Sequence, residues 1–95
     1  MQNKIISQIK FKAEKLFLDL GFKKLNISSE NIYEYKNMYL KFTYLDAINS
    51  FVIECAISIE GVYKNLYEDS DILQVSLGEK ELLCQLQQLL VSYYL

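Results

Sequence analysis

The chain has 95 residues, of which 52% are hydrophobic and 23% are charged, with a formal net charge of −2. This composition predicts a single globular domain over residues 1–95 and excludes a disordered chain. The sequence has no histidine and no arginine, the side chains that most often act as a general base or hold an anion in catalysis. We therefore expect a binding protein and not an enzyme.

Nothing in the sequence resembles a membrane span or a secretion signal. The longest apolar runs, such as residues 51–53, contain three residues, whereas a spanning helix needs about 20. Residues 1–5 lack the apolar core and the cleavage site of a signal peptide. We expect a cytoplasmic protein that does not bind a membrane.

Residues 4–20 are predicted to form an amphipathic helix that ends at Gly21, after which Phe22 would pack back on Phe17. The lysines surround this helix and do not line one side of it, which favours a solvated surface over a nucleic-acid site. The apolar residues recur at steps of three and four, as on one face of a helix: Ile5, Ile9, Ala13, Leu16 and Leu20.

Residues 32–58 are predicted to form a three-stranded antiparallel meander. Apolar and polar residues alternate in two stretches, which is typical of strands with one buried face. The two apolar rows are Met38, Leu40, Phe42 and Tyr44, and then Phe51, Ile53, Cys55 and Ile57.

The connections between these strands set their register. A loop of four residues, 46–49, keeps both apolar rows on the same side of the sheet. A two-residue turn at Lys36-Asn37 would bring Tyr33 and Tyr35 to that side as well, although it lacks the usual glycine. The expected cross-strand pairs are Tyr44 with Phe51, Phe42 with Ile53, Leu40 with Cys55, and Lys41 with Glu54.

Two helices are predicted after the meander. Ser58 would cap a short helix over residues 59–67, followed by a loop at residues 69–71 and a possible short strand at residues 72–75. Ser76, with Glu79 at the spacing of a capping box, would start a long helix that ends near Tyr94. Its predicted apolar side carries Leu82, Leu83, Leu86, Leu89, Leu90 and Tyr93, and its polar side carries Glu81, Gln85, Gln88 and Ser92.

These elements predict an α+β fold in two layers. Both long helices must bury an apolar stripe, and the meander offers one strongly apolar face, so the helices should cover that face. The opposite face would be semi-apolar and is a candidate contact surface. It would present Tyr39, Lys41, Thr43, Val52 and Glu54.

The charges are segregated along the chain. Residues 1–41 carry eight of the ten lysines and four carboxylates, a balance of +4, whereas residues 42–95 carry two lysines and eight carboxylates, a balance of −6. An acidic surface attracts cationic proteins and repels nucleic acid, and tyrosine supplies contact area. The first candidate surface for a basic protein partner is therefore the densest acidic segment: Glu60, Tyr63, Tyr67, Glu68, Asp69 and Asp71.

No cofactor or metal ion is expected. Cys55 and Cys84 each lie in an apolar pattern, which predicts two reduced core residues, and without histidine they cannot complete a tetrahedral zinc site. Asp69-x-Asp71 begins like a calcium loop but lacks the glycine and the distant glutamate of such a loop. A carboxylate pair such as Glu68 and Asp71 could act on a glycoside, but it lacks the signature of a pocket.

The second half of the chain resembles small bacterial immunity proteins of polymorphic-toxin and contact-dependent growth inhibition systems. The resemblance lies in residues 51–58 (FVIECAIS), residues 61–71 (GVYKNLYEDSD) and the helix start at residues 76–83. It implies tight binding to a cognate toxin, often a nuclease, and neutralisation of that toxin by covering its basic surface.

An alternative of another class is a small acidic, dimeric chaperone for a secreted effector. Such a chaperone would need an apolar dimer surface and grooves for an unfolded client. A small enzyme is a third reading, which would need a deep pocket holding a strained carboxylate.

Overall fold

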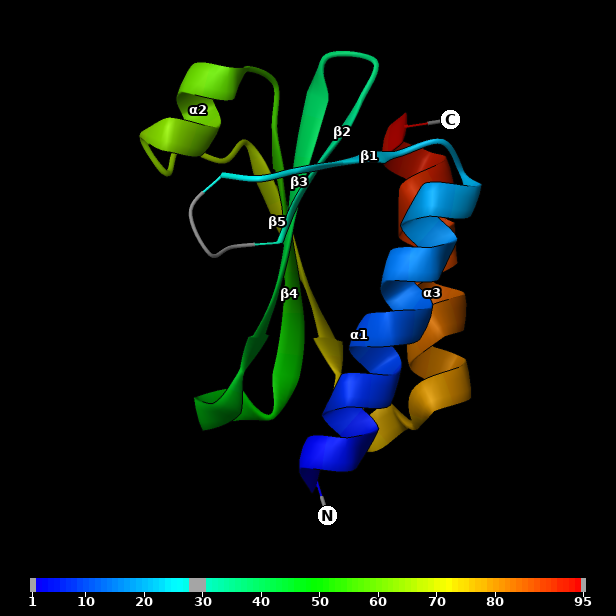
Figure 1. Ribbon diagram of the computed structural model, residues 1–95. Coiled ribbons are helices and arrows are strands. Elements are labelled where there is room, and N and C mark those ends of the chain that lie inside the picture. Colours follow the sequence, from blue (N-terminus) through cyan, green and yellow to red (C-terminus); the bar gives the residue numbers. More distant parts are fainter. Residues whose placement is uncertain (1, 28–30, 95) are drawn as a thin grey trace.

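The computed structural model of the chain describes residues 2–27 and 31–94, which form two long helices, one short helix and an antiparallel sheet of five strands (Figure 1). This architecture confirms the predicted α+β class. In chain order the elements are α1 (Gln2–Asp19), β1 (Lys23–Leu25), β2 (Ile32–Tyr35), β3 (Met38–Leu45), β4 (Ser50–Ala56), α2 (Ile59–Tyr63), β5 (Asp69–Gln74) and α3 (Glu79–Tyr94).

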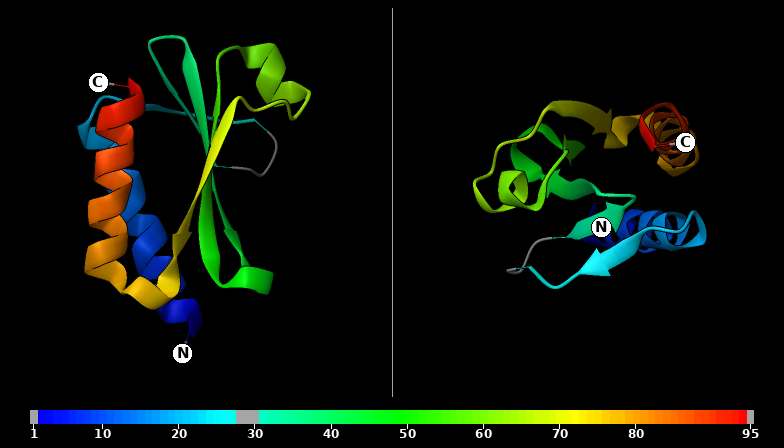
Figure 2. Two further views of the ribbon diagram at one scale, coloured as in Figure 1. Left: turned by 180° about the vertical axis from the view of Figure 1, so that it is seen from behind. Right: turned by 90° about the horizontal axis from the view of Figure 1, so that it is seen from above.

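The strands lie in the sheet in the order of the chain, from β1 at one edge to β5 at the other. The helices α1 and α3 pack side by side over one face, as predicted, whereas α2 lies on the opposite side (Figures 1 and 2). In the right-hand view of Figure 2, α1 lies toward β1 and α3 toward β5. The order of the strands therefore places α1 and β1, from the start of the chain, on one side of the molecule. It places β5 and α3, from the end of the chain, on the other side.

The main hydrophobic core fills the space between the sheet and the two long helices. Its fully buried side chains include Ile9 and Phe17 of α1, Phe51 of β4, and Leu82 and Leu86 of α3. A smaller cluster, built on Ile32, Ala56 and Val62, lies between the other face of the sheet and α2. The short helix is thus held by apolar contacts of its own.

The register of the central hairpin is as predicted. Phe42 pairs with Ile53 and Lys41 with Glu54, and the same ladder joins Tyr44 to Phe51 and Leu40 to Cys55. The loop at Asp46–Ile48 forms a 3₁₀ turn, and Asn49 then adopts a left-handed conformation with φ 46°. An even number of loop residues leaves both apolar rows on the side that faces α1 and α3.

The turn between β2 and β3 is the predicted two-residue turn. Lys36 and Asn37 both have positive φ, 49° and 65°, which is the backbone of a type I′ turn. The pairing of Tyr33 with Leu40 follows from it. Asparagine tolerates this conformation well, whereas lysine is uncommon in it, so the turn forms without the glycine that usually marks it.

The strand β1 was not predicted, and β5 was predicted only as a possible short strand at residues 72–75. The sheet has five strands and not three, because β1 adds three residues at one edge and β5 adds six at the other. Residues 69–71, predicted as a loop, form the first half of β5. Aspartate and serine have low strand propensity, but an edge strand gains its hydrogen bonds from its neighbour, and pairing with β4 overrides that propensity.

The short helix α2 ends at Tyr63, earlier than the predicted residue 67. Ser58 caps it as expected, because its hydroxyl oxygen accepts a hydrogen bond from the Gly61 N–H at 3.1 Å. The chain then reverses: the Leu66 N–H donates to the Gly61 carbonyl at 2.7 Å. A Cβ at Gly61 would lie 2.9 Å from the carbonyl oxygen of Leu66, so this close return requires glycine.

The long helix α3 begins at Glu79, and the capping box predicted at Ser76 is wrong. Ser76 lies in a separate 3₁₀ turn, Val75–Leu77, and Gly78 follows with φ 93°. That conformation is open to glycine but breaks a helix of L-residues, so the helix cannot run continuously from Ser76. The spacing of serine and glutamate does not reveal this break.

Three side chains predicted on buried rows are exposed: Ile5, Ile57 and Cys84. The buried stripe of α1 runs through Ile6, which turns Ile5 outward. Ile57 follows the last residue of β4, so strand alternation no longer applies to it. The side chain of Tyr93, predicted on the stripe of α3, lies outside the described part of the structure.

Candidate binding surface on the acidic side of the sheet

The fold converts the charge segregation of the sequence into two sides of the molecule. Exposed Lys23 and Lys24 lie on β1 at one edge, and Asp69 and Asp71 lie on β5 at the other. This arrangement arises because strand order equals chain order. The acidic side is therefore a property of the β4, β5 and α3 region and not of one loop.

The residues of the predicted acidic segment do not form one continuous surface. Asp69 and Asp71 pair with Cys55 and Ile53, so their side chains are on the face of the sheet that packs against α1 and α3. Glu60 belongs to α2, on the opposite face. The edge of the sheet at β5 separates the two groups.

The other members of this segment have different surroundings. Tyr63 is 69% exposed, and Glu68 is exposed just before β5. Tyr67 is partly buried, packs against the smaller apolar cluster, and has the Lys41 Nζ 5.6 Å from its ring centre. We conclude that Tyr63 and Glu68 are available to a partner, while the Tyr67 ring holds the segment against the sheet.

A groove runs between β5 and α3. It has a volume of about 400 Å³, and the residues that line it include two carboxylates and no lysine. The contribution of Glu81 was missed at the sequence level, because the groove exists only once β5 lies beside α3. We call it the β5 groove; it is lined by Asp71, Ile72, Leu73, Glu81, Gln85, Gln88, Leu89 and Ser92.

The second candidate surface, on the opposite face of the sheet, is divided in two. The half of this surface next to α2 lies under the smaller apolar cluster. Tyr39 packs there, and its hydroxyl donates a hydrogen bond to a Glu34 carboxylate oxygen at 3.0 Å. This hydrogen bond raises the pKa of the Tyr39 hydroxyl. The other half lies outside the smaller cluster. It contains a row of residues that pair across three strands, namely Thr43, Val52 and Ile72.

In that row Ile72 is 59% exposed although it lies on a strand. It pairs with Val52, whose side chain is partly exposed on the same face. Val52 and Ile72 therefore form an apolar strip that reaches the outer edge of β5 on one face of the sheet. The β5 groove reaches the same edge on the other face. Glu54, the remaining member of the second surface, is also partly exposed and lies opposite Lys41.

The basic side is organised by a cluster that joins α1 to the first two strands. The Glu14 carboxylate lies 2.7 Å from the Lys24 Nζ, and accepts a hydrogen bond from the Tyr33 hydroxyl at 3.2 Å. The Lys24 contact lowers the pKa of Glu14. Burial, together with the charge of Glu14, raises the pKa of Tyr33. These contacts hold β1 against the helix layer.

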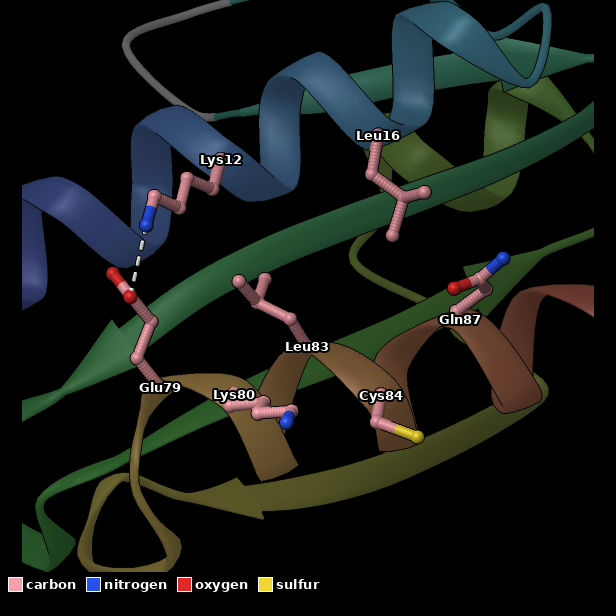
Figure 3. A pocket seen from close by; sticks show the side chains of 7 residues that line it. All are labelled: Lys12, Leu16, Glu79, Lys80, Leu83, Cys84 and Gln87. Carbon is pink, nitrogen blue, oxygen red and sulfur yellow. Dashed lines mark hydrogen bonds and ion pairs between the residues drawn. The ribbon is translucent and has the colours of Figure 1, made fainter.

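A second hollow, of about 520 Å³, lies between α1 and α3 (Figure 3). An ion pair between the Lys12 Nζ and a Glu79 carboxylate oxygen, 2.9 Å apart, closes one end of it. Cys84 lines it and is exposed, so the prediction of a core thiol is wrong for this residue. It is confirmed for Cys55, which is buried. Cys84 lies off the buried stripe of Leu82 and Leu86, two residues away from each, which turns its thiol outward.

Within residues 2–27 and 31–94, no three acidic or cysteine side chains come together in a way that could hold a metal ion. None of the helices described combines the length and the apolar character needed to cross a bilayer. No family model, curated protein or solved structure was found to match this chain.

Proposed function

We propose that the protein is an immunity protein that binds a cognate toxin with a basic surface, a nuclease in particular, and neutralises it by covering that surface. The observation that carries the proposal is the acidic side of the molecule. Over residues 60–81 the chain has six carboxylates and two lysines. Asp69 and Asp71 lie on the edge strand β5, and Glu81 of α3 joins Asp71 in the β5 groove. A basic active site is the kind of surface that such a field attracts and covers.

The state of these carboxylates supports the proposal. Glu68 and Asp69 are exposed and form no ion pair with any described residue. By contrast, Glu79 is paired with Lys12, and Glu60 lies 3.8 Å from Lys64. Unpaired surface carboxylates at a sheet edge are open to a lysine or arginine of a partner.

The test uses the product of the neighbouring gene as the toxin candidate. The double variant Glu68→Lys/Asp69→Lys should weaken its binding by at least about tenfold at low salt, because like charges then face each other. It should also abolish protection of cells that express the toxin. Affinity of the parent should fall as salt rises, mainly through slower association.

A matched control is Asp19→Lys/Asp46→Lys, which makes the same change of net charge at two exposed positions away from β5. It should bind and protect like the parent. Because Asp69 lies in a strand, its replacement could also affect folding. The unfolding midpoints of both variants must therefore match that of the parent protein. If both variants protect equally, or if the neighbouring product is harmless without this protein, the proposal fails.

The chaperone alternative depends on a different surface. On the outer side of α1, Phe11 is 71% exposed and Leu18 is 50% exposed, which would suit an apolar dimer contact. A dimer in sedimentation velocity that Phe11→Glu converts to monomer would favour the chaperone. A monomer at micromolar concentration would favour the immunity protein.

A further inference from the structure

The outer edge of β5 faces no other strand in the part of the chain that the structure describes. β5 has six residues, and it pairs with β4 along its whole length, from Asp69 opposite Cys55 to Gln74 opposite Ser50. The backbone N–H and C=O groups on the free edge of a strand are a template for pairing with a further strand. The opposite edge, β1, offers only three residues.

The two sides of this edge differ in chemistry. On the side of the long helices lies the β5 groove, with the carboxylates of Asp71 and Glu81 and no lysine among its lining residues. On the other side lies the apolar strip, in which Ile72 is more than half exposed beside Val52. Side chains of an added strand point alternately to these two sides.

We propose that the toxin's binding segment adds to the outer edge of β5 as a sixth strand, and that basic residues alternate with apolar ones along it. This inference rests on the proposed function, because it takes the basic partner from there. The basic side chains reach into the β5 groove, and the apolar side chains cover Ile72. Backbone hydrogen bonds supply part of the affinity, and the alternating side chains supply the specificity.

Charge decides between a foreign segment and a second copy of this chain. Two copies joined through β5 would bring Asp69 and Asp71 of each chain against a strand that carries the same two charges. Like charges across a strand pair are destabilising, and charged residues on edge strands commonly prevent self-association. A cationic segment makes the same backbone bonds and neutralises these carboxylates.

The probe is a synthetic peptide of about seven residues in which lysine alternates with valine, with both ends blocked. It should shift the amide resonances of β5 and slow their exchange with water. The decisive control is the same peptide N-methylated at its interior residues, which keeps the charge and the composition but removes the donors. Its affinity should fall by about tenfold or more, because several backbone hydrogen bonds are lost.

Two further comparisons test whether the peptide contacts both the β5 groove and the apolar strip. A peptide of the same composition, with its lysines in one block and its valines in another, should bind several-fold more weakly, because it cannot match groove and strip together. Ile72→Ser should weaken the alternating peptide several-fold. Val91→Ser, which changes an exposed apolar residue of α3, should leave its affinity unchanged.

Three outcomes would overturn the inference. They are a parent protein that is already a dimer with protected β5 amides, an alternating peptide that fails to bind at millimolar concentration, and an N-methylated peptide that binds as well as the parent peptide. If the N-methylated peptide still binds while Glu68→Lys/Asp69→Lys abolishes binding of both the peptide and the toxin, strand addition fails and the proposed function stands. If the toxin binds that variant as tightly as the parent protein, the proposed function fails instead.

Discussion

The two edges of the sheet differ in length, in charge and in what they contact. β1 has three residues, carries Lys23 and Lys24, and is held to α1 by the Glu14–Lys24 contact. β5 has six residues, carries Asp69 and Asp71, and borders a groove. Short length and a tether are common ways to close an edge against unwanted pairing. The first edge is thus closed by its short length and its contact with α1, whereas within residues 2–27 and 31–94 the feature that protects the second edge is its charge.

Charge on an edge strand can have two effects at once. Like charges on facing strands disfavour the pairing of two copies, and the same carboxylates favour a cationic strand over a neutral one. A short edge such as β1 offers few backbone groups for pairing with any partner.

The largest difference between the edges should appear in their contribution to stability. Leu73 of β5 is 2% exposed and belongs to the main core, so Leu73→Ala should cost about 2–5 kcal/mol of unfolding free energy. Leu25 of β1 is only partly buried, and Leu25→Ala should cost about 1 kcal/mol. Urea unfolding of both variants measures the difference. Equal costs would show that β5 is no better anchored than β1.

Removing the charges of the β5 edge should make the protein associate with itself. Asp69→Thr/Asp71→Thr leaves a six-residue edge with good strand propensity and no like-charge repulsion, which is worth roughly 0.2–1 kcal/mol for each charge. Sedimentation velocity should show dimers or larger species at concentrations where the parent is monomeric. Lys23→Thr on the short β1 edge is the control and should stay monomeric. A monomeric double variant would mean that something other than charge protects β5.

The smallest effect should come from the tether of β1. Because the folded-state pKa of Glu14 is lowered by Lys24, its contribution is complete above the unfolded pKa of about 4.3 and is lost as pH falls through the folded pKa. The Lys24 and Glu14 side chains are 45% and 33% exposed, so solvent screening limits the contribution of the contact to about half a kcal/mol or less. Glu14→Gln should therefore be less stable than the parent at neutral pH and equal to it in acid. A constant difference across that range would contradict the assignment.

The sequence predicted the helices and the central hairpin because their signals are local and repeated. Alternation and loop parity gave the pairing of Phe42 with Ile53, which the ladder confirms. The strands at the edges could not be found in this way. Residues 69–71 have low strand propensity and pair with β4 only in the folded sheet, and Gly78 breaks a helix that the side-chain pattern would extend to Ser76.

The acidic character of the candidate surface could be predicted from composition, but the arrangement of its residues in space could not. The acidic segment of residues 60–71 was read as one surface, and the sheet edge divides it because α2 crosses to the other face. Glu81 joins the β5 groove from α3, ten residues after Asp71 in the sequence. Such neighbours follow from tertiary contacts, and a charge count along the chain cannot reveal them.

The order of the strands also has a consequence for how the chain folds. Every strand pairs with its neighbour in sequence, so the sheet grows by closing short loops, each at a small entropic cost. The helix layer is different, because the contact between Lys12 and Glu79 joins residues 67 positions apart. A finished meander shortens that separation in space and presents one apolar face to both helices. The sheet is therefore the template on which the two distant helices meet.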